Sequence, residues 1–301
     1  MNEKSPREAE TGFDRLLAFA IPERDCRGRV IRLGPALDTI LSAHDYPPAI
    51  KMLLAEALVL AALMGGLLKG EGDQMTMQAQ TNGGIISLLV CDYRNGEVRG
   101  YVQHDRERFA EIGANPSLET LFGEGFLAIT FDIAGTGERY QGVVPMEGDT
   151  LSEAVESYFG RSEQLPTLIR TAVRSGREGC IAGGILVQHL ADGEEGRERL
   201  HVQVNRPEWE HVATMAASVR HEELVDPAIS LETLVWRLYH DESEIRIEQS
   251  APIRRGCRCS EVHFEEVLAR FPSDDRKDMR NDSGMILVDC AFCSREFAIQ
   301  D

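Results

Sequence analysis

Short segments in which apolar and polar residues alternate are spread over residues 27–192. A period of two is typical of strands that bury one face, and clusters of Gly, Asn and Asp such as TNGG and YRNGE separate these segments, as hairpin turns do. The segments are RVIRLG (29–34), MTMQAQT (75–81), IISLLVCDY (85–93), VRGYVQH (98–104), FLAITFDI (126–133), RYQGVVPM (139–146) and GGILVQHL (183–190). The pattern therefore predicts β-sheet over most of this region.

One long apolar run interrupts the alternation. It extends from Met52 to Leu68 and contains a single charged residue, Glu56. At about 17 residues it is at the short limit for a membrane span. Pro47 and Pro48 precede it, as prolines do at the first turn of a helix. A helix that is apolar nearly all round must be covered on most sides. We therefore expect a buried helix between sheets, in an α+β fold whose N-terminal domain has β/α/β layers.

Three shorter segments follow different patterns. TLSEAVESYF (150–159) and LPTLIRTAVRS (165–175) have the spacing of amphipathic helices. The segment ADGEEGRER (191–199) is polar, charged and contains glycine. We interpret it as a loop that ends the first domain.

Two amphipathic helices are predicted within residues 206–240. The apolar face of the first consists of Trp209, Val212, Ala216 and Val219. The second has Ser230 as a candidate N-cap, and its apolar face consists of Leu231, Leu234, Val235 and Leu238. Both tryptophans, Trp209 and Trp236, lie in this stretch. Helices of this length are not stable alone in water, so they must dock on another part of the protein.

Charge and composition narrow the classes of partner. The 301 residues carry a net charge of −18, and the last 45 hold ten acidic side chains against six basic ones. Nucleic acids and anionic membranes bind clustered positive charge, so neither is expected as a partner. The first 25 residues have no uninterrupted apolar stretch of the kind found in secretory signals. We therefore expect a cytoplasmic protein, whose thiols are kept reduced.

Four of the seven cysteines lie in the last 45 residues, in GCRCSEVHF and VDCAFCSREF. Cys257, Cys259, Cys290 and Cys293 form the pattern C-x-C-x30-C-x2-C. Four thiolates in two tight pairs are typical of a closed structural zinc site, and zinc would supply the folding energy that so small a segment lacks. Two alternatives are a set of buried free cysteines and a site in which His263 replaces one thiol. His263 lies in VHFEEVLARF, which is predicted to be a helix with this histidine on its surface.

The C-x-C spacing is narrower than that of most structural zinc loops. Two cysteines at i and i+2 of a strand have Cα atoms about 6.5–7 Å apart, at the limit of disulfide geometry. A turn would bring the sulfurs together in a strained and easily reduced disulfide. Thiolates held by zinc are also the form that oxidants attack. Three arginines flank this pair: Arg254, Arg255 and Arg258. Their positive charge would stabilise the thiolate form of the cysteines, or they form a solvated basic turn.

Loss of the metal is expected to have a large effect. Structural zinc contributes about 10–16 kcal/mol to small metal-folded units, whereas a whole domain is stable by only about 5–15 kcal/mol. Oxidation of the ligands should therefore unfold the C-terminal segment and loosen helices that dock through it. The apolar surface that would then be exposed, as a site for non-native proteins requires, includes Trp209, Leu234, Trp236 and Leu238.

At this point the chain resembles the heat-shock protein 33 family of redox-regulated chaperones. The resemblance covers nearly all of residues 27–293, with the four-cysteine pattern as its most specific part. The other matching segments are RGRVIRLGPALDTIL, HDYPPAIKMLLAEALVLAALMG, MQAQTNGGIISLLVCDYR, ERYQGVVPMEGDTLSEAVESYFGRSEQLPT and VWRLYHDE.

The resemblance implies an ATP-independent holdase, not an enzyme. It implies an N-terminal chaperone core domain (1–193), a metastable helical linker (194–256) and a zinc-binding redox-switch domain (257–301). The reduced form, with one Zn²⁺ per chain, is inactive. Oxidation with unfolding activates it, with disulfides Cys257–Cys259 and Cys290–Cys293 between near neighbours. Its partners are unfolded or misfolded client proteins, and the oxidised active form is a homodimer.

Two other classes remain open from the residues alone. One is a zinc-ribbon module that binds nucleic acid, which the acidic C-terminus disfavours. The other is a thiol–disulfide oxidoreductase that uses Cys290 and Cys293, which the second thiol pair disfavours. No G-x-S-x-G, Walker A or full G-x-G-x-x-G motif is present. Cys91 ends an apolar run and is predicted to be a packed core thiol. Cys26 and Cys180 lie in charged or glycine-flanked stretches, and their role stays open.

Overall fold

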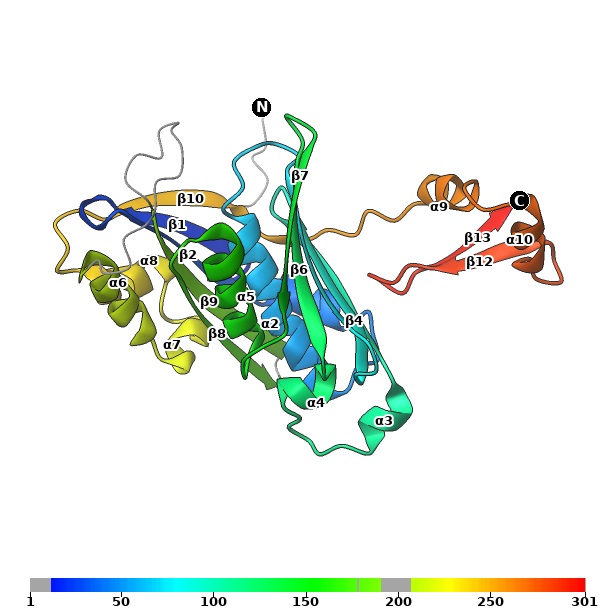
Figure 1. The fold of residues 1–301 in the computed structure, drawn as a ribbon, viewed down its shortest axis with the longest axis horizontal. Coiled ribbons are helices and arrows are strands. Elements are labelled where there is room, and N and C mark those ends of the chain that lie inside the picture. Colours follow the sequence, from blue (N-terminus) through cyan, green and yellow to red (C-terminus); the bar gives the residue numbers. More distant parts are fainter. Residues whose placement is uncertain (1–11, 178, 191–206, 301) are drawn as a thin grey trace, which may run out of the picture.

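Two antiparallel sheets enclose one long helix, and a small C-terminal unit extends from this core (Figure 1). The computed structural model describes residues 12–177, 179–190 and 207–300. The five-stranded sheet has the order β10-β1-β2-β9-β8. Its strands are β1 (Arg15–Ile21), β2 (Cys26–Leu33), β8 (Thr167–Gly176), β9 (Gly179–His189) and β10 (Arg246–Pro252).

The six-stranded sheet has the order β11-β5-β4-β3-β6-β7, and only the β11–β5 pair is parallel. Its strands are β3 (Gln74–Thr81), β4 (Ile86–Arg94), β5 (Glu97–His104), β6 (Gly125–Ile133), β7 (Glu138–Pro145) and β11 (Arg254–Arg255). Asn95 and Gly96 both have positive φ at the turn between β4 and β5. This is the geometry that an Asn-Gly hairpin turn requires, so the YRNGE signal is confirmed.

Helix α2 (Pro48–Gly65) lies between the sheets and contacts β2, β8 and β9 on one side and β3, β4 and β5 on the other. Its side chains are buried nearly all round, which confirms the predicted sandwiched helix and the β/α/β layering. This is also the one helix of the described residues that is long and apolar enough to cross a membrane. Its burial in the core accounts for that composition.

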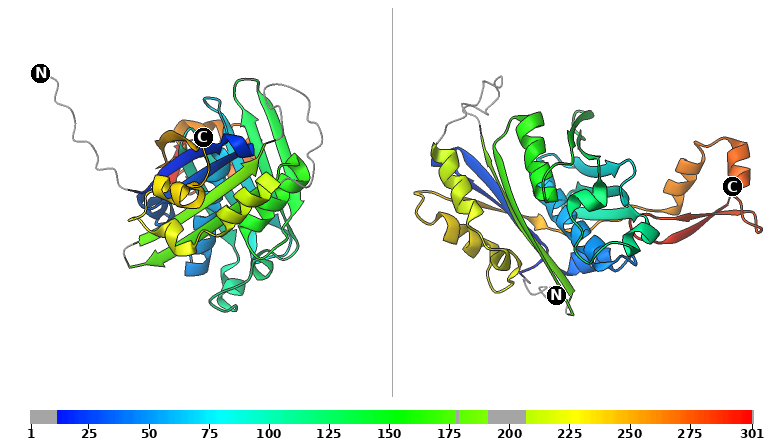
Figure 2. Two further views of the ribbon diagram at one scale, coloured as in Figure 1. Left: turned by 90° about the vertical axis from the view of Figure 1, so that its left-hand side faces the viewer. Right: turned by 60° about the horizontal axis from the view of Figure 1, so that its bottom comes forward.

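Three helices cover the other face of the five-stranded sheet (Figure 2). They are α6 (Pro207–Ala217), α7 (His221–Val225) and α8 (Leu231–Tyr239). Ile185 and Val187 of β9 pack with these helices, while Leu186 faces the cluster around α2. A strand buried on both faces reads as a continuous apolar run, as β9 does. Ser230 accepts a hydrogen bond from the Thr233 N–H, which confirms the predicted N-cap of α8.

The remaining elements are short. In the core they are α1 (Pro35–Leu41), α3 (Arg106–Ala110), α4 (Leu118–Phe122), α5 (Leu151–Tyr158), a 3₁₀ turn (Pro22–Arg24) and a π turn (Phe159–Glu163). The C-terminal unit consists of α9 (Glu261–Leu268), α10 (Ser273–Asp278), β12 (Met285–Asp289) and β13 (Glu296–Gln300). Helix α5 confirms the helix predicted at 150–159.

One predicted element is wrong and five strands were missed. Residues 165–175 do not form an amphipathic helix but strand β8, whose backbone pairs with β9 along its whole length. Tertiary pairing overrides a weak helical pattern here, because β9 would otherwise lie at an unprotected edge. Strands β1, β10, β11, β12 and β13 were not predicted, and β10 and β11 lie inside the segment expected to be helical. The predicted loop at 191–199 lies outside the described residues.

Candidate metal centre

Four thiols from two loops converge on one point. Cys257 and Cys259 follow β11 in an extended segment, and Cys290 and Cys293 lie in the tight turn between β12 and β13. In that turn the N–H groups of Cys293 and Ser294 both donate to the Cys290 carbonyl, at 3.2 and 2.8 Å. The four sulfur atoms all lie within 4.8 Å of one another. The C-x-C and C-x2-C pairs thus form one cluster, as their spacing predicted.

The cluster has dimensions that suit a metal ion. The Sγ–Sγ distances are 3.3 Å for Cys257–Cys259, 3.6 Å for Cys257–Cys290 and 3.5 Å for Cys259–Cys293. A tetrahedron with metal–sulfur bonds of about 2.3 Å has edges of about 3.8 Å. The thiols are therefore nearly at the separation that four-thiolate coordination needs, and they could hold a metal ion without rearrangement of their loops.

The thiols also shift one another's pKa values. Burial acts to raise the pKa of Cys257. The backbone N–H of Cys259 and hydrogen bonds with the three neighbouring thiols outweigh this effect and lower that pKa to about 7. Burial and hydrogen bonds to neighbouring sulfurs raise the pKa of Cys259 and of Cys290. One thiolate stabilised by adjacent thiols is the arrangement in which a cation readily replaces the remaining protons.

The unit that carries these thiols has almost no apolar core. Its buried apolar cluster consists of Leu268, Ile286 and Ile299, with Phe264, Val288 and Phe297 partly buried beside them. By contrast, the cluster around α2 contains several dozen buried residues. Units of about 40–70 residues with so small a core usually require a metal or disulfides to fold.

The Cys290–Cys293 turn docks on the core through Phe292. The Phe292 ring meets Tyr101 of β5 edge-on, with ring centroids 4.9 Å apart, and the Arg99 guanidinium lies 3.9 Å from its centroid. His44 bonds with both the Phe292 carbonyl (3.3 Å) and the Ser294 hydroxyl (3.1 Å). These contacts tie the thiol turn to the six-stranded sheet and to the loop before α2. We call them the Phe292 latch.

Arg258 makes a second tie from the other thiol loop. It lies between Cys257 and Cys259, donates to the Gln74 side chain at 3.0 Å and pairs with buried Asp92 at 3.5 Å. Asp92 also pairs with Arg99 at 2.6 Å. The Arg258 side chain is thus directed at the core and not at the thiols. Within the described part of the chain it neither pairs with a thiolate nor forms a solvated turn. Arg254 and Arg255 are exposed on β11.

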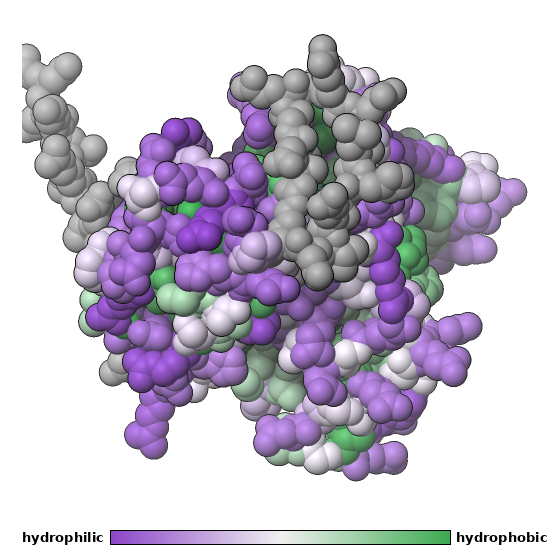
Figure 3. Space-filling view, turned by 60° about the vertical axis from the view of Figure 1, so that its left-hand side comes forward, coloured by the Kyte–Doolittle hydropathy of each residue, from purple (hydrophilic) through white to green (hydrophobic). Residues whose placement is uncertain are grey.

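The four residues predicted for client binding lie on the docked linker helices in different environments. Leu234 and Leu238 are buried against the five-stranded sheet, and Trp209 is partly buried beside them. Trp236 lies on the opposite side of α8 and is already 60% exposed. Most of the visible surface on this side of the molecule is hydrophilic, with apolar side chains in small separate patches (Figure 3).

A buried arginine, which the sequence reasoning missed, anchors the linker. Arg32 of β2 is fully buried and donates to three carbonyls of the linker: Leu224 (2.9 Å), Ile229 (2.7 Å) and Glu223 (3.1 Å). Burial lowers the pKa of its guanidinium. The sequence signal for this buried contact was a charged residue, Arg32, within the apolar strand pattern RVIRLG. The sequence signal for the Phe292 latch was a single aromatic residue between two ligand-type cysteines.

The other predicted positions are consistent with structural roles. Cys91 is fully buried in β4, as predicted, and Cys26 and Cys180 are also buried. Burial raises the pKa of Cys26 to about 12 and that of Cys180 to about 11, which makes both thiols poor nucleophiles. His263 is exposed on α9 and is not among the four converging side chains.

The fold and the site define a class: a two-sheet core with a buried helix that carries a C-terminal four-cysteine unit. A solved structure from Thermotoga maritima, described as a 33 kDa chaperonin and heat shock protein 33 homolog, has this fold. It superposes with a TM-score of 0.76 at 20% identity and covers 95% of each chain.

Sequence comparison gives the family. A family model described as Hsp33 protein matches residues 14–300. The 33 kDa chaperonin of Caulobacter vibrioides is 38% identical over 293 residues, which are 95% of this chain and 94% of the relative. That of Shigella boydii is 33% identical over 286 residues, covering 94% and 91%. The chain belongs to the Hsp33 family, whose matched members are named chaperonins and not enzymes.

Proposed function

We propose that this protein is a redox-regulated, ATP-independent holdase. In the reduced state one Zn²⁺ is bound by Cys257, Cys259, Cys290 and Cys293, and the protein is inactive. Oxidation releases the zinc, unfolds the C-terminal unit and the linker, and exposes apolar surface that binds unfolding proteins. The observation that carries this proposal is the convergence of four thiols in a unit whose buried apolar cluster has only three residues.

The chemistry is a four-electron oxidation. The two thiolates of each pair form one S–S bond and give two electrons to an oxidant such as hydrogen peroxide, which takes up two protons and becomes two water molecules. Once the sulfurs are bonded to each other they no longer bind zinc. The metal contributes about 10–16 kcal/mol in small zinc-folded units, and three buried apolar side chains do not replace that contribution.

The expected disulfides are Cys257–Cys259 and Cys290–Cys293. The shortest sulfur separation is that of Cys257 and Cys259, at 3.3 Å. The cross-pairs Cys257–Cys290 and Cys259–Cys293 are almost as close in the reduced state. Near-neighbour pairing is favoured because it persists when the two loops separate on unfolding. Peptide mapping of the oxidised protein in which cross-pairs predominate would refute this assignment.

The route from the thiols to the linker passes through the strands that precede Cys257. The linker helices and the C-terminal unit lie at opposite ends of the core (Figure 1). Between them, β11 pairs with β5, and β10 pairs with β1 at the edge of the five-stranded sheet. When the C-terminal unit unfolds, the Phe292 latch and the Arg258 tie are lost, and this edge strand loses its anchor.

The linker is poised to undock because one of its ties is costly. Arg32 buries a full charge, and among the described residues its hydrogen bonds go to carbonyls and not to a carboxylate. Asp226 acts on the guanidinium only at longer range, and desolvation outweighs it. A buried ion without a bonded counter-charge loses hydration that dipoles restore only in part. Undocking would return the guanidinium to water and expose Leu234 and Leu238 together. The linker thus combines an apolar contact, smaller than the cluster around α2, with a polar penalty.

The remaining features of the proposal follow the same scheme. The core domain comprises residues 1–193, the linker 194–256 and the redox switch 257–301. The location is the cytoplasm, where reduced thiols would keep zinc bound until oxidative stress. The clients are unfolded or misfolded proteins, and the active, oxidised form is a homodimer. Support for these features comes from family membership and from the acidic surface, which disfavours nucleic acid.

The decisive experiment compares the reduced and the peroxide-treated protein in one assay. Aggregation of a chemically unfolded client is followed by light scattering while zinc release is followed with a chromogenic chelator. We expect suppression of aggregation only after zinc release. The emission of Trp209, recorded in a Trp236→Phe background, should shift to longer wavelength in parallel. Equal suppression by the reduced protein, or zinc release without suppression, would overturn the proposal.

A further inference from the structure

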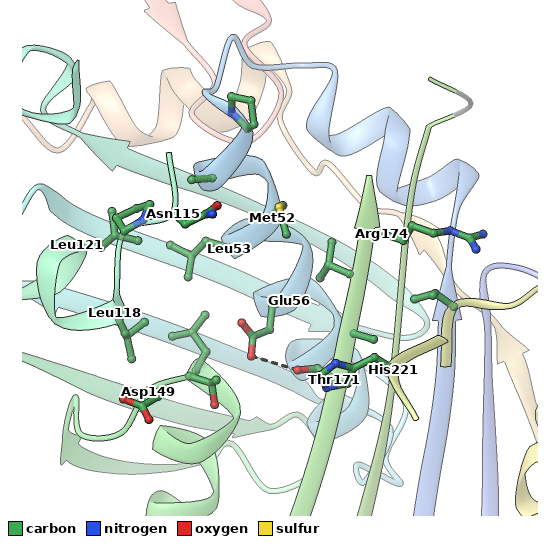
Figure 4. A pocket seen from close by; sticks show the side chains of 18 of the residues that line it. Met52, Leu53, Glu56, Asn115, Leu118, Leu121, Asp149, Thr171, Arg174 and His221 are labelled. Carbon is green, nitrogen blue, oxygen red and sulfur yellow. Dashed lines mark hydrogen bonds between the residues drawn. The ribbon is translucent and has the colours of Figure 1, made fainter. Parts of the chain in front are cut away.

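A cleft of about 750 Å³ lies between the core and the linker (Figure 4). Helix α2 and strand β8 form its base, the loops before α4 and α5 form one side, and α7 forms the other. The wall at α7 consists of His221, Glu222 and Val225. This cleft is remote from the four thiols, and neither the metal centre nor its docking contacts use it.

One carboxylate is built into the base of the cleft. Glu56 is the single charged residue of the apolar run 52–68 in and after helix α2. Its Oε1 accepts hydrogen bonds from Ser152 Oγ (2.9 Å), Ser152 N (3.3 Å) and Thr171 Oγ1 (3.1 Å). Its Oε2 has no hydrogen-bond donor among the described residues and points into the cleft (Figure 4). Desolvation by burial raises the pKa of Glu56. The side chain is thus fixed in place with one acceptor unused.

The rest of the lining selects a ligand of one charge type. Leu53, Leu118, Leu121 and Val173 supply an apolar surface around Glu56. Three carboxylates line the cleft, Glu56, Asp149 and Glu222, and one arginine, Arg174, opposes them. His221 also lines it. All of these side chains except Glu56 are exposed. The cleft is therefore apolar inside and net negative, with its least solvated carboxylate at the bottom. Anions are disfavoured, and a neutral apolar ligand would leave Oε2 without a donor.

We propose that this cleft binds a small organic cation, a primary ammonium group on an apolar body. The ammonium donates to Glu56 Oε2, and the apolar body lies against Leu53, Leu118 and Leu121. An ammonium group supplies donors where the cleft has only an acceptor, and it offsets the unfavourable burial of the carboxylate. A compact hydrocarbon body removes the leucine side chains from water.

Binding at this position also has a regulatory consequence, which rests on the proposed function. The α7 wall belongs to the linker, so the complete cleft exists only when the linker is docked. A ligand that binds the docked state alone stabilises it in proportion to RT ln(1 + [L]/Kd). The organic cation therefore acts as a brake: at a concentration tenfold above its Kd it lowers the undocked fraction about elevenfold.

Binding is tested on the reduced, zinc-loaded protein with benzylammonium as the probe, by isothermal titration calorimetry and ligand-observed NMR. Glu56→Gln keeps an oxygen that accepts from Ser152 and Thr171 but removes the charge, and it should weaken binding about 10- to 100-fold. Glu222→Gln at the exposed rim should change affinity less than threefold. Benzyl alcohol, which has the same ring without the charge, should bind more weakly than benzylammonium and should not distinguish Glu56→Gln from the parent protein. Absence of benzylammonium binding, or equal binding by Glu56→Gln, overturns the proposal.

The brake is tested separately, so that the site and the proposed chaperone function can fail independently. Benzylammonium should slow the appearance of aggregation suppression after peroxide treatment in the parent protein and leave the Glu56→Gln variant unaffected. If the cation binds through Glu56 and activation is not slowed, the binding site stands and its coupling to the linker is refuted.

Discussion

The core around α2 and the C-terminal unit fold by different means. In the core, two sheets bury one helix almost completely, so apolar contact alone can account for a stable domain. In the C-terminal unit, three buried apolar residues support two helices and a hairpin, and four thiols occupy the position of a core. One chain thus contains a part held together by apolar contact and a part in which four thiols stand where a core would be.

The proposed linker belongs to neither type, and its intermediate character fits the responsive role that we propose for it. It packs apolar residues on the five-stranded sheet as a normal layer would, but among the described residues its buried arginine is hydrogen-bonded only to carbonyls. Its apolar cluster is smaller than that of the core, and sub-global opening draws on the less stable regions of a protein. The comparison therefore predicts that damage to the thiols spreads to the linker and stops at the core.

The largest expected effect comes from removing one thiol. Cys290→Ser should abolish stoichiometric zinc binding and unfold the C-terminal unit, because a closed structural site needs all four ligands. Zinc content by atomic absorption and hydrogen exchange measured by mass spectrometry report the two consequences. Amides of residues 257–300 should exchange within seconds, while those of α2 stay protected.

The matched control is Cys91→Ala, which removes a fully buried thiol from the core. It should keep zinc and the protection of the C-terminal unit while lowering the stability of the core by about 1–2 kcal/mol. Stoichiometric zinc in Cys290→Ser would contradict the ligand set. Fast exchange in α2 of the same variant would contradict the separation between the two folding types.

The next effect concerns the linker. Replacing Leu234 and Leu238 by serine removes two buried side chains from α8, at about 2–5 kcal/mol each. The linker should undock while zinc stays bound, so the reduced variant should suppress client aggregation. Trp236→Ser on the same helix is the control, because that side chain is 60% exposed already. A double variant that stays inactive when reduced, with its linker amides still protected, would place the client surface elsewhere.

The sequence predicted those parts of the fold that are specified by local pattern. The run around Glu56 could only be a covered helix, and each of the seven proposed strand segments overlaps a strand of the structure. Strand β8 was assigned to a helix because TLIRTAV fits both periods. Its β-branched residues at every second position (Thr167, Ile169, Thr171 and Val173) were the signal for a strand. Strand β10 depends on pairing with a strand more than 200 residues away, which no local pattern reveals.

The site was predictable to a similar degree. Ligand-type side chains at metal spacing are a local signal, so the four thiols could be grouped from the sequence. The Phe292 latch and the Arg32 tie depend on which surfaces meet in three dimensions. Arg99 and Phe292 meet in the structure although they are far apart in the sequence. Similarly, the position of Arg32 in a strand pattern does not indicate which carbonyls its guanidinium will contact.

A smaller effect is expected from the Phe292 latch. Phe292→Ala removes one aromatic contact and one cation–π contact, worth about 1–3 kcal/mol together. Zinc should stay bound, but the C-terminal unit should detach from the core and peroxide activation should proceed several-fold faster. Leu287→Ala, at an exposed position of β12, is the control. Unchanged activation kinetics in Phe292→Ala would show that the docking contact does not restrain the switch.

The smallest effect tests how well the core tolerates a buried charge. Desolvation raises the pKa of Glu56 in the folded protein above its unfolded value of 4.5. The folded state therefore holds more protons than the unfolded state between these two pKa values, and stability falls as the pH rises through the folded one. Glu56→Gln should raise Tm relative to the parent protein at pH 8, and this difference should shrink as the pH is lowered toward 4.5. Because the two proteins share the same thiols, pH effects on the metal centre cancel in the difference.

The exposed Glu222→Gln exchange should give a difference near zero at every pH. A Tm advantage of Glu56→Gln that grows on acidification would mean that Ser152 and Thr171 stabilise the carboxylate more than burial destabilises it, and that the core holds this charge without penalty.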